Sequence, residues 1–340
     1  MLLIADPISP RGHKFFDTLY ISELKRTTEN ILFLASDEIT RNIMDDIQKI
    51  NLPSKMFKYR SSIDYRIKMW QKLNIISKFK NKYNCKNTLF LSYENISTAI
   101  IAHRFERLFV VNHNNIDEIL TSKVKHLFFT SLPINVEHIV FHQYIKNYLN
   151  NEVKIKNKIN VIHHPTLLFD DKPYEKPSPI VVFAPSSSSD FTLDKIKYFF
   201  NILLKMKKLV TIVTKNRFRN FLPNSLNIIS KDYFTIEEYK KWMVTADVVF
   251  VPLNFKYRIS GVIIDALANN NLVFTTKCPF TEGYKRDYPF MIHFVETINS
   301  NKDLLEIIKY SSNNCFLKDR KKFIKDHSIL NISKKIKEII

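Results

Sequence analysis

The stretch DVVFVPLNFKYRISGVIIDALANNNLVFTT, residues 247–276, decides the fold class. Its apolar runs predict buried strands at 248–253 and 272–276, with a helix at 261–268 between them. A strand, helix and strand joined in this way form a parallel pair, and a parallel sheet binds its ligand beyond the carboxyl ends of its strands. The sequence therefore predicts an α/β fold with a ligand site in the turn before the helix.

That turn and the start of the helix hold the polar groups that would meet a ligand. The amides that open a helix lack partners within it and carry a partial positive charge, so Ser260 and Gly261, with Arg258 beside them, suit a diphosphate. Asp265 comes one helical turn after Gly261 and can accept hydrogen bonds from ribose hydroxyls. The alternative is an ordinary amphipathic helix with one acid, as in many doubly wound proteins.

Residues 258–268, RISGVIIDALA, resemble the carboxyl-half motif of sugar-nucleotide glycosyltransferases with the GT-B architecture. In that family a Ser-Gly pair opens a helix, and an acidic residue followed by Ala-Leu-Ala comes one turn later. Two positions depart from the retaining E-x7-E group of the family, because Tyr257 and Asp265 stand where that group has glutamates. A third departure is at 269–271, where asparagines replace a glycine after the helix.

The resemblance implies a fold, a donor and a set of donor contacts. It implies two Rossmann-like domains that face each other across a cleft, a nucleoside-diphosphate sugar as donor, most simply a UDP-sugar, and catalysis without a metal ion or another cofactor. Lys215 and Arg258 would neutralise the departing diphosphate. Helix capping, a solvated lysine and core packing are the alternatives for the serine, lysine and aromatic residues in this set. The implied donor-binding residues are Ser186, Lys215, Tyr233, Phe234, Tyr257, Arg258, Ser260, Gly261 and Asp265.

The first half of the chain opens with a strand, a turn and a helix, so its first loop is expected at the carboxyl edge of a second sheet. The polar run NHNN, residues 112–115, follows a strand at 108–111 and is expected at the same edge. His113 in this run can orient a sugar hydroxyl or accept a proton, which makes it a catalytic candidate. Turn formation and helix capping are the alternative. The substrate-binding candidates here are Gly12, His13, Tyr93, Asn114 and Asn115.

The chain is expected to form two domains. The proline-rich and charged stretch 170–179 predicts a linker between a first domain, 1–169, and a second, 180–315. We expect a final helix over 316–340 that packs back on the first domain, as the resemblance implies. Further expectations for local structure are helices across 41–84, a strand at 126–130, a helix at 139–148 and a loop at 279–289.

Composition excludes several classes of protein. Only three glycines occur in 340 residues, and none lie close enough to form a dinucleotide-binding G-x-G-x-x-G, a P-loop or a G-x-S-x-G elbow. No Asp-x-Asp triplet occurs, which argues against a metal-dependent GT-A transferase. The three cysteines lie far apart and favour a reducing cytosol, and no apolar run approaches the length of a membrane span. A hydrophobic content of 45% excludes a disordered chain.

The formal charge of +19 has several explanations. One explanation is an AT-rich genome, which raises the lysine content without selection for a ligand. Alternatively, the positive field would attract anionic lipids, a diphosphate-linked acceptor or nucleic acid. We expect a cytoplasmic glycosyltransferase that acts on a glycan, lipid-linked or glycoprotein acceptor; attachment to the inner membrane surface and self-association both stay open. The alternatives are a non-catalytic GT-B partner subunit and a basic nucleic-acid-binding protein.

Overall fold

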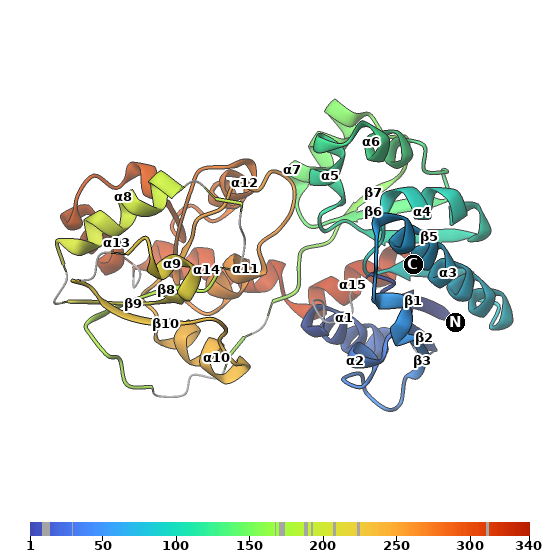
Figure 1. Cartoon of the computed structure of the whole chain (residues 1–340), viewed down its shortest axis with the longest axis horizontal. Coiled ribbons are helices and arrows are strands. Elements are labelled where there is room, and N and C mark those ends of the chain that lie inside the picture. Colours follow the sequence, from blue (N-terminus) through green and yellow to red (C-terminus); the bar gives the residue numbers. More distant parts are fainter. Residues whose placement is uncertain are drawn as a thin grey trace. The chain divides into compact units, whose positions relative to one another are not determined.

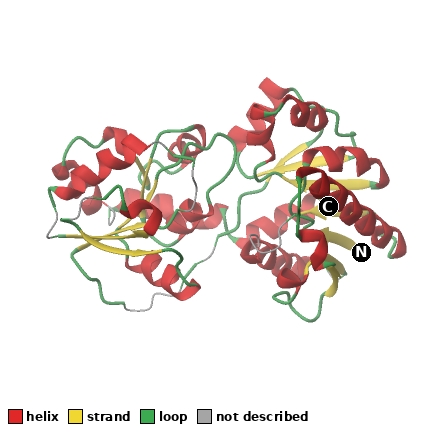
Figure 2. Ribbon diagram, viewed as in Figure 1, coloured by secondary structure: helices red, strands yellow, loops and turns green. Residues whose placement is uncertain are grey.

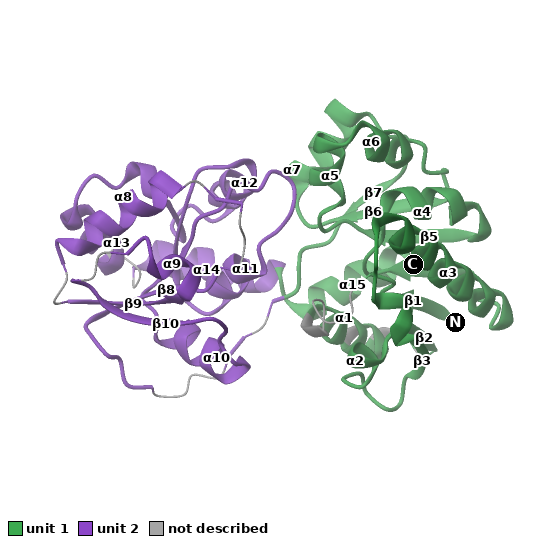
Figure 3. Ribbon diagram, in the orientation of Figure 1, with its two compact units in different colours: residues 1–165, 327–340 green, residues 166–326 purple. Residues whose placement is uncertain are grey.

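A computed structural model of the chain describes residues 1–8, 14–28, 30–166, 168–169, 174–186, 190–191, 193–206, 209–222, 225–310 and 313–340. The chain divides into two compact units, each built on its own parallel sheet (Figures 1, 2 and 3). Unit 1 comprises residues 1–165 together with 327–340, and unit 2 comprises 166–326. The prediction of two parallel α/β domains is therefore confirmed.

The sheet of unit 1 has seven strands in the order β3-β2-β1-β4-β5-β6-β7, and every neighbouring pair is parallel. The central strands are continuous apolar runs that are buried on both sides, as expected where helices cover both faces of a sheet. The strands are β1 (Leu2–Ala5), β2 (Ile31–Ser36), β3 (Gln48–Leu52), β4 (Asn87–Phe90), β5 (Arg107–Val111), β6 (Val136–Val140) and β7 (Ile159–Val161).

Helices cover both faces of this sheet. Right-handed crossovers place α1 and α2 on one face and the helices that follow β3 on the other. In agreement, α4 contacts both α3 and α6, whereas α1 contacts α15. The helices of unit 1 are α1 (Lys14–Thr27), α2 (Asp37–Thr40), α3 (Ser62–Lys82), α4 (Asn95–Ile101), α5 (Asn115–Thr121), α6 (Lys123–Thr130), α7 (Gln143–Tyr148) and α15 (Ile329–Ile339), with short helical turns at Ser54–Phe57 and Leu149–Val153.

Unit 2 repeats the arrangement with six parallel strands in the order β10-β9-β8-β11-β12-β13. The strands are β8 (Ile180–Ala184), β9 (Val210–Lys215), β10 (Asn227–Lys231), β11 (Val248–Val251), β12 (Leu272–Thr275) and β13 (Ile292–Phe294). The helices are α8 (Leu193–Leu204), α9 (Asn216–Arg219), α10 (Ile236–Thr245), α11 (Gly261–Ala268), α12 (Pro279–Asp287), α13 (Asn301–Tyr310) and α14 (Asn314–Asp326). The predicted β11–α11–β12 connection is present, and its helix has the predicted bounds.

Four local predictions need correction. Residues 126–130 lie in helix α6 and not in a strand, because the Ser122 hydroxyl accepts a bond from the Lys125 amide and starts a helix there. The predicted helix 139–148 begins only at α7, since its first residues complete strand β6. The predicted loop 279–289 holds α12, and strand β3 interrupts the predicted helices of 41–84.

The carboxyl-terminal segment forms two helices, where a single one over 316–340 was expected. α14 belongs to unit 2, and α15 starts anew at Ser328, whose hydroxyl accepts a bond from the Asn331 amide. The end of α15 is fastened to the sheet of unit 1, because Arg107 and Asn87 donate hydrogen bonds of 2.9 and 2.8 Å to the last two carbonyls of the chain. None of the described helices has the length and apolar character needed to span a membrane.

Candidate functional site

The carboxyl edge of the unit 2 sheet gathers the residues predicted to bind a donor. Lys215 ends β9, Ser186 is buried just after β8, and residues 252–260 form the loop between β11 and α11. The Asn254 amide donates a 3.0 Å hydrogen bond to the Asp190 carbonyl, which joins the loop after β11 to the one after β8. Parallel strands deliver all of these loops to one edge, where such sheets bind ligands.

Arg258 contacts Phe255 and Asp190. Its guanidinium carbon lies 3.6 Å from the centre of the Phe255 ring, and its Nη2 lies 3.4 Å from a carboxylate oxygen of Asp190. About a quarter of the Arg258 side chain, 27%, is exposed. Stacking on an aromatic face fixes a planar guanidinium while leaving its edge available for hydrogen bonds. Arg258 is therefore a cation that stacks on Phe255 and forms a long, partly solvated ion pair with Asp190.

Lys215 and Tyr233 form a second cationic and aromatic contact at this edge. The Lys215 ammonium lies 5.6 Å from the centre of the Tyr233 ring, and that ring is 82% exposed. Burial and the nearby Arg217 lower the pKa of Lys215, so a bound anion would relieve both effects. Phe234 differs from its neighbour, because its ring packs 5.4 Å from the core residue Phe183. Tyr233 is therefore largely exposed, whereas Phe234 packs on the core.

The start of α11 is open. Ser260 is the residue before the helix, and its side chain makes no capping hydrogen bond. A Cβ atom added at Gly261 would meet no other heavy atom within 4 Å. The backbone of Gly261 does not occupy the left-handed region either, so the fold of unit 2 has no need of glycine here. The space around Gly261 is therefore open, and the unpaired amides of a helix start favour an anion.

The carboxylate of Asp265 is held by a hydrogen bond from Tyr239, a residue that was not predicted from the sequence. The Tyr239 hydroxyl on α10 donates a 3.0 Å hydrogen bond to Asp265 Oδ2, and the Tyr239 ring packs 5.8 Å from Phe183. Burial raises the pKa of Asp265 to about 7, and the bond from Tyr239 lowers it. Nothing in the sequence connects Tyr239 with Asp265, because they lie on different helices. Tyr257, the other departure from the family motif, is half-buried in the loop before α11.

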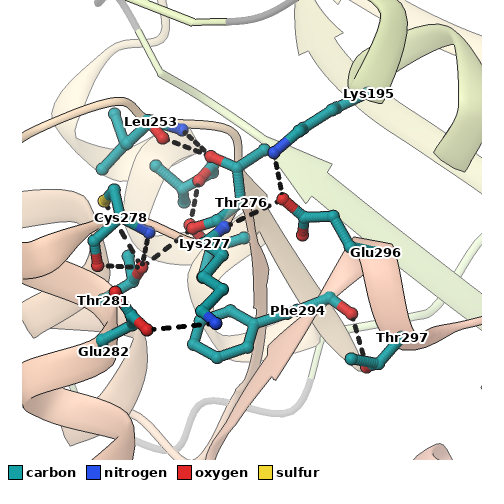
Figure 4. A network of polar contacts seen from close by, with 12 residues as sticks. Lys195, Leu253, Thr276, Lys277, Cys278, Thr281, Glu282, Phe294, Glu296 and Thr297 are labelled. Atoms are coloured by element: carbon teal, nitrogen blue, oxygen red, sulfur yellow. Dashed lines mark hydrogen bonds and ion pairs between the residues drawn. The ribbon is translucent and has the colours of Figure 1, made fainter.

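A polar network locks the loop after β11 to the loop after β12 (Figure 4). The Leu253 amide donates a 2.9 Å hydrogen bond to Thr276 Oγ1, and the Thr276 hydroxyl donates in turn to the Leu253 carbonyl. Thr281 Oγ1 lies 2.8 Å from the Thr276 carbonyl and accepts a bond of 3.0 Å from the Cys278 amide. Glu296, which follows β13, accepts from the Lys277 amide at 3.1 Å. These hydrogen bonds therefore fix the beginning of the loop that carries Phe255 and Arg258.

His113 sits among aromatic rings at the carboxyl edge of the unit 1 sheet. Its Nε2 lies 2.9 Å from the Leu91 carbonyl, and its ring centre lies 4.7 Å from Phe16 and 5.1 Å from Phe141. A carbonyl oxygen can only accept, so Nε2 carries the proton and Nδ1 holds the lone pair in the neutral ring. In this tautomer, Nδ1 is the ring nitrogen that would take up a further proton.

Three other residues of unit 1 that were predicted to bind substrate lie in the described part of the chain. Two of them hold neighbouring loops of the unit together. Tyr93 is 2% exposed and donates a 2.7 Å hydrogen bond to Asn112 Oδ1. Asn115 is also buried and donates to the Tyr93 carbonyl at 2.8 Å and to Asn95 Oδ1 at 3.1 Å. Their polar groups thus hold the loops after β4 and β5 together, while Asn114 is exposed at the start of α5. Gly12 and His13 lie outside the described residues.

A buried acidic cluster after β1 was not anticipated. Asp6 is fully buried and accepts bonds from the Ile8 amide, at 3.0 Å, and from the Ser92 hydroxyl. Burial and the neighbouring Asp6 raise the pKa of Asp17 well above its usual range. The Lys72 ammonium bonds the Pro7 carbonyl. The sequence signal was an acid directly after a strand. Among the described residues, no group of histidine, cysteine and acidic side chains is arranged to hold a metal ion.

Comparisons with known proteins give the family of folds. No family model and no curated protein matches the sequence. The structure is similar to a glycosyltransferase from Rickettsia africae (14% identity, TM-score 0.71, covering 99% of this chain and 97% of that one). It is also similar to sucrose-phosphate synthase from Thermosynechococcus elongatus (10% identity, TM-score 0.73, covering 99% of this chain and 97% of that one). A third similar structure is HepE from Anabaena in complex with UDP-glucose (12% identity, TM-score 0.65, covering 99% of this chain and 98% of that one). The chain therefore has the two-domain GT-B fold of glycosyltransferases.

Proposed function

We propose that the protein is a glycosyltransferase that uses a nucleoside-diphosphate sugar, most simply a UDP-sugar, bound at the carboxyl edge of the unit 2 sheet. The observation that carries this proposal is the open start of α11, where a Cβ added at Gly261 would meet no other heavy atom within 4 Å and the first helix amides lack intrahelical partners. A diphosphate has the charge and the size for that position. HepE, which shares the fold, was crystallised with UDP-glucose.

Catalysis would come from stabilising the departing diphosphate. The bond between the anomeric carbon and the diphosphate oxygen breaks, its electron pair stays on the diphosphate, and the acceptor hydroxyl bonds to the carbon and gives up its proton. Arg258, Lys215 and the first amides of α11 would bind the charge that develops, so that the proposal requires no metal ion. His113 is proposed to orient the acceptor hydroxyl or take its proton.

The proposed acceptor is a glycan, a lipid-linked sugar or a glycoprotein in the synthesis of surface polysaccharide or glycoconjugate. The proposed location is the cytoplasm, because Cys85, Cys278 and Cys315 are all free thiols and a reducing compartment keeps them so. Analysis of the products made from a UDP-sugar, with and without candidate acceptors, separates transfer from simple hydrolysis of the donor.

The decisive test is an Arg258→Ala variant, measured by calorimetric titration with UDP-sugars. Loss of a stacked guanidinium should weaken binding at least about tenfold, with little change in unfolding temperature, because charge-assisted bonds to phosphate contribute about 1.5–3 kcal/mol. Arg286→Ala is the matched control, since Arg286 is an exposed arginine on α12 of the same unit. Equal affinities for wild type and Arg258→Ala would contradict the proposed site.

A further inference from the structure

The first half of α3 carries an apolar face that the fold of unit 1 leaves uncovered. Ile63, Ile67 and Trp70 are 71%, 51% and 48% exposed, and their spacing of four and three residues places them on one side of the helix. The same helix has a separate buried stripe, Met69, Leu73 and Ile76, that packs in the core. The exposed face is therefore additional to the packing of α3.

Cations flank this face. Lys55, Lys58 and Arg60 precede α3, are exposed, and make no ion pair in the described part of the chain. The loop that carries them is fastened to the first turns of α3, because the Lys68 ammonium donates to the Lys58 carbonyl at 2.6 Å and the Arg60 amide donates to Asp64 at 2.8 Å. The backbone that carries these three cations is thus held against the first turns of α3.

The one acidic side chain in the first two turns of α3 is neutralised. Asp64 pairs with Lys68 at 2.7 Å, and Arg66 pairs with Glu94 at 2.8 Å. The charges left over in this region are therefore all positive. An aromatic and aliphatic stripe with flanking lysine and arginine is the pattern of helices that lie in the interface of an anionic bilayer.

A second copy of the chain fits this face poorly. A two-fold dimer would set the same cations of both copies close together, which costs free energy. Three side chains over two helical turns also offer less area than the roughly 1,200 Å² or more that stable interfaces bury. We propose that Ile63, Ile67 and Trp70, with Lys55, Lys58 and Arg60, form a docking face for a membrane surface that contains anionic lipid.

The two tryptophans of the chain make the proposal directly measurable. Trp242 is buried in unit 2, so a Trp242→Phe variant leaves Trp70 as the only tryptophan. Adding vesicles of equimolar phosphatidylcholine and phosphatidylglycerol to the full chain should shift Trp70 emission to shorter wavelength. Vesicles of phosphatidylcholine alone should cause a much smaller shift. If Trp242→Phe fails to fold, co-sedimentation of the wild-type chain with the same vesicles replaces the fluorescence measurement.

Two variants and a matched control test the residues. Ile63→Ser with Ile67→Ser, and separately Lys55→Ser with Lys58→Ser and Arg60→Ser, should each lower the partition coefficient at least about tenfold. Leu209→Ser with Ile236→Ser removes comparably exposed apolar groups from unit 2 and should leave it unchanged. No binding by the wild type, equal binding by the face variants, or self-association that the Ile63 and Ile67 changes abolish would each overturn the proposal.

Discussion

Gly261 shows how a single residue can be assigned to a ligand by the lack of any other reason for it. Its backbone does not require glycine, and a side chain there would meet nothing of the protein itself. A glycine that neither the backbone nor the packing of unit 2 requires is consistent with a need for open space at the start of α11.

We therefore expect Gly261→Ala to keep or raise the stability of unit 2 and to weaken binding of a UDP-sugar. A Gly261→Leu variant should weaken binding further, because its side chain fills more of the open space before α11. Urea denaturation gives the stability, and calorimetric titration gives the affinity. Unchanged affinity in Gly261→Leu would show that no ligand approaches these amides.

Asp265 gives a prediction about stability and pH. Its carboxyl group has a pKa of about 7 in the folded chain, against an ordinary value of 3.8. The folded state therefore holds a proton that the unfolded chain has lost, and the free energy of unfolding must fall as pH rises between these two values. Asp265→Asn removes this effect while keeping an acceptor for Tyr239. From below this pH window to above it, the stability of Asp265→Asn relative to wild type should therefore rise by on the order of 4 kcal/mol.

The same titration should appear in binding. A carboxylate is a stronger acceptor for ribose hydroxyls than a neutral carboxyl group, so affinity for a UDP-sugar should rise with pH through about 7. Asp265→Asn should show no such rise. The diphosphate of a UDP-sugar is a diester without a titrating group in this range, so the ligand itself adds no slope. A pH profile shared by wild type and variant would remove Asp265 from the donor site.

The residues of the site were only partly predictable, because sequence order does not reveal exposure. Arg258 and Gly261 could be found, since a helix start after a buried strand defines the position of both. Tyr93 and Asn115 were proposed to bind substrate from the same kind of reasoning, yet both are buried and bonded to their neighbours. Tyr239 could not be found, because its link to Asp265 depends on how two helices pack.

At the scale of elements, secondary structure was predicted wrongly in short segments where the pattern of apolar residues along the sequence does not match which residues are buried. Strand β6 was hidden by Glu137 and His138, two polar residues that are buried within it. The buried charge of Glu137 is neutralised by Arg107, whose Nη2 lies 2.6 Å from Glu137 Oε1. No pattern of neighbouring residues in the sequence predicts this ion pair. Conversely, residues 126–130 have the apolar content of a strand, but only Phe129 among them is buried, because consecutive residues of a helix point in different directions and one side of α6 packs on the core. Long apolar runs such as β11 and β12 were recognised correctly.

Helix α15 offers a matched test within one element. Ile336 is 1% exposed and packs in unit 1, whereas Leu330 on the same helix is 75% exposed. Ile336→Ala should lower the free energy of unfolding by about 2–5 kcal/mol, and Leu330→Ala should change it by about 0.5 kcal/mol or less. Urea denaturation followed by circular dichroism measures both. Similar losses in the two variants would mean that α15 does not pack against the core of unit 1.

At the scale of the molecule, the donor residues all fall within one unit. Every proposed donor contact lies within residues 166–326, a continuous segment with its own six-stranded sheet and core. The presence of two parallel α/β domains was predicted from the alternation of apolar runs and helical segments, whereas the order of the strands comes from the structure. The joining of residues 327–340 to unit 1 depends on contacts distant in sequence, such as that between α1 and α15.

A fragment of residues 166–326 should therefore fold alone and bind a UDP-sugar with an affinity within about tenfold of the whole chain. Circular dichroism establishes folding, and titration calorimetry establishes binding. The full chain serves as the reference, and the same fragment with Arg258→Ala serves as the negative control. A folded fragment that binds no UDP-sugar would show that unit 1 supplies essential donor contacts.

The discontinuity of unit 1 has a consequence for biosynthesis. Its last helix, α15, is translated only after the whole of unit 2 has been synthesised. Until then the nascent amino-terminal part lacks the cover that Ile332 and Ile336 provide, and the apolar side of α1 stays bare for the time needed to make unit 2. Premature termination within 327–340 would leave that surface permanently uncovered, so such truncated products should be retained by chaperones or degraded.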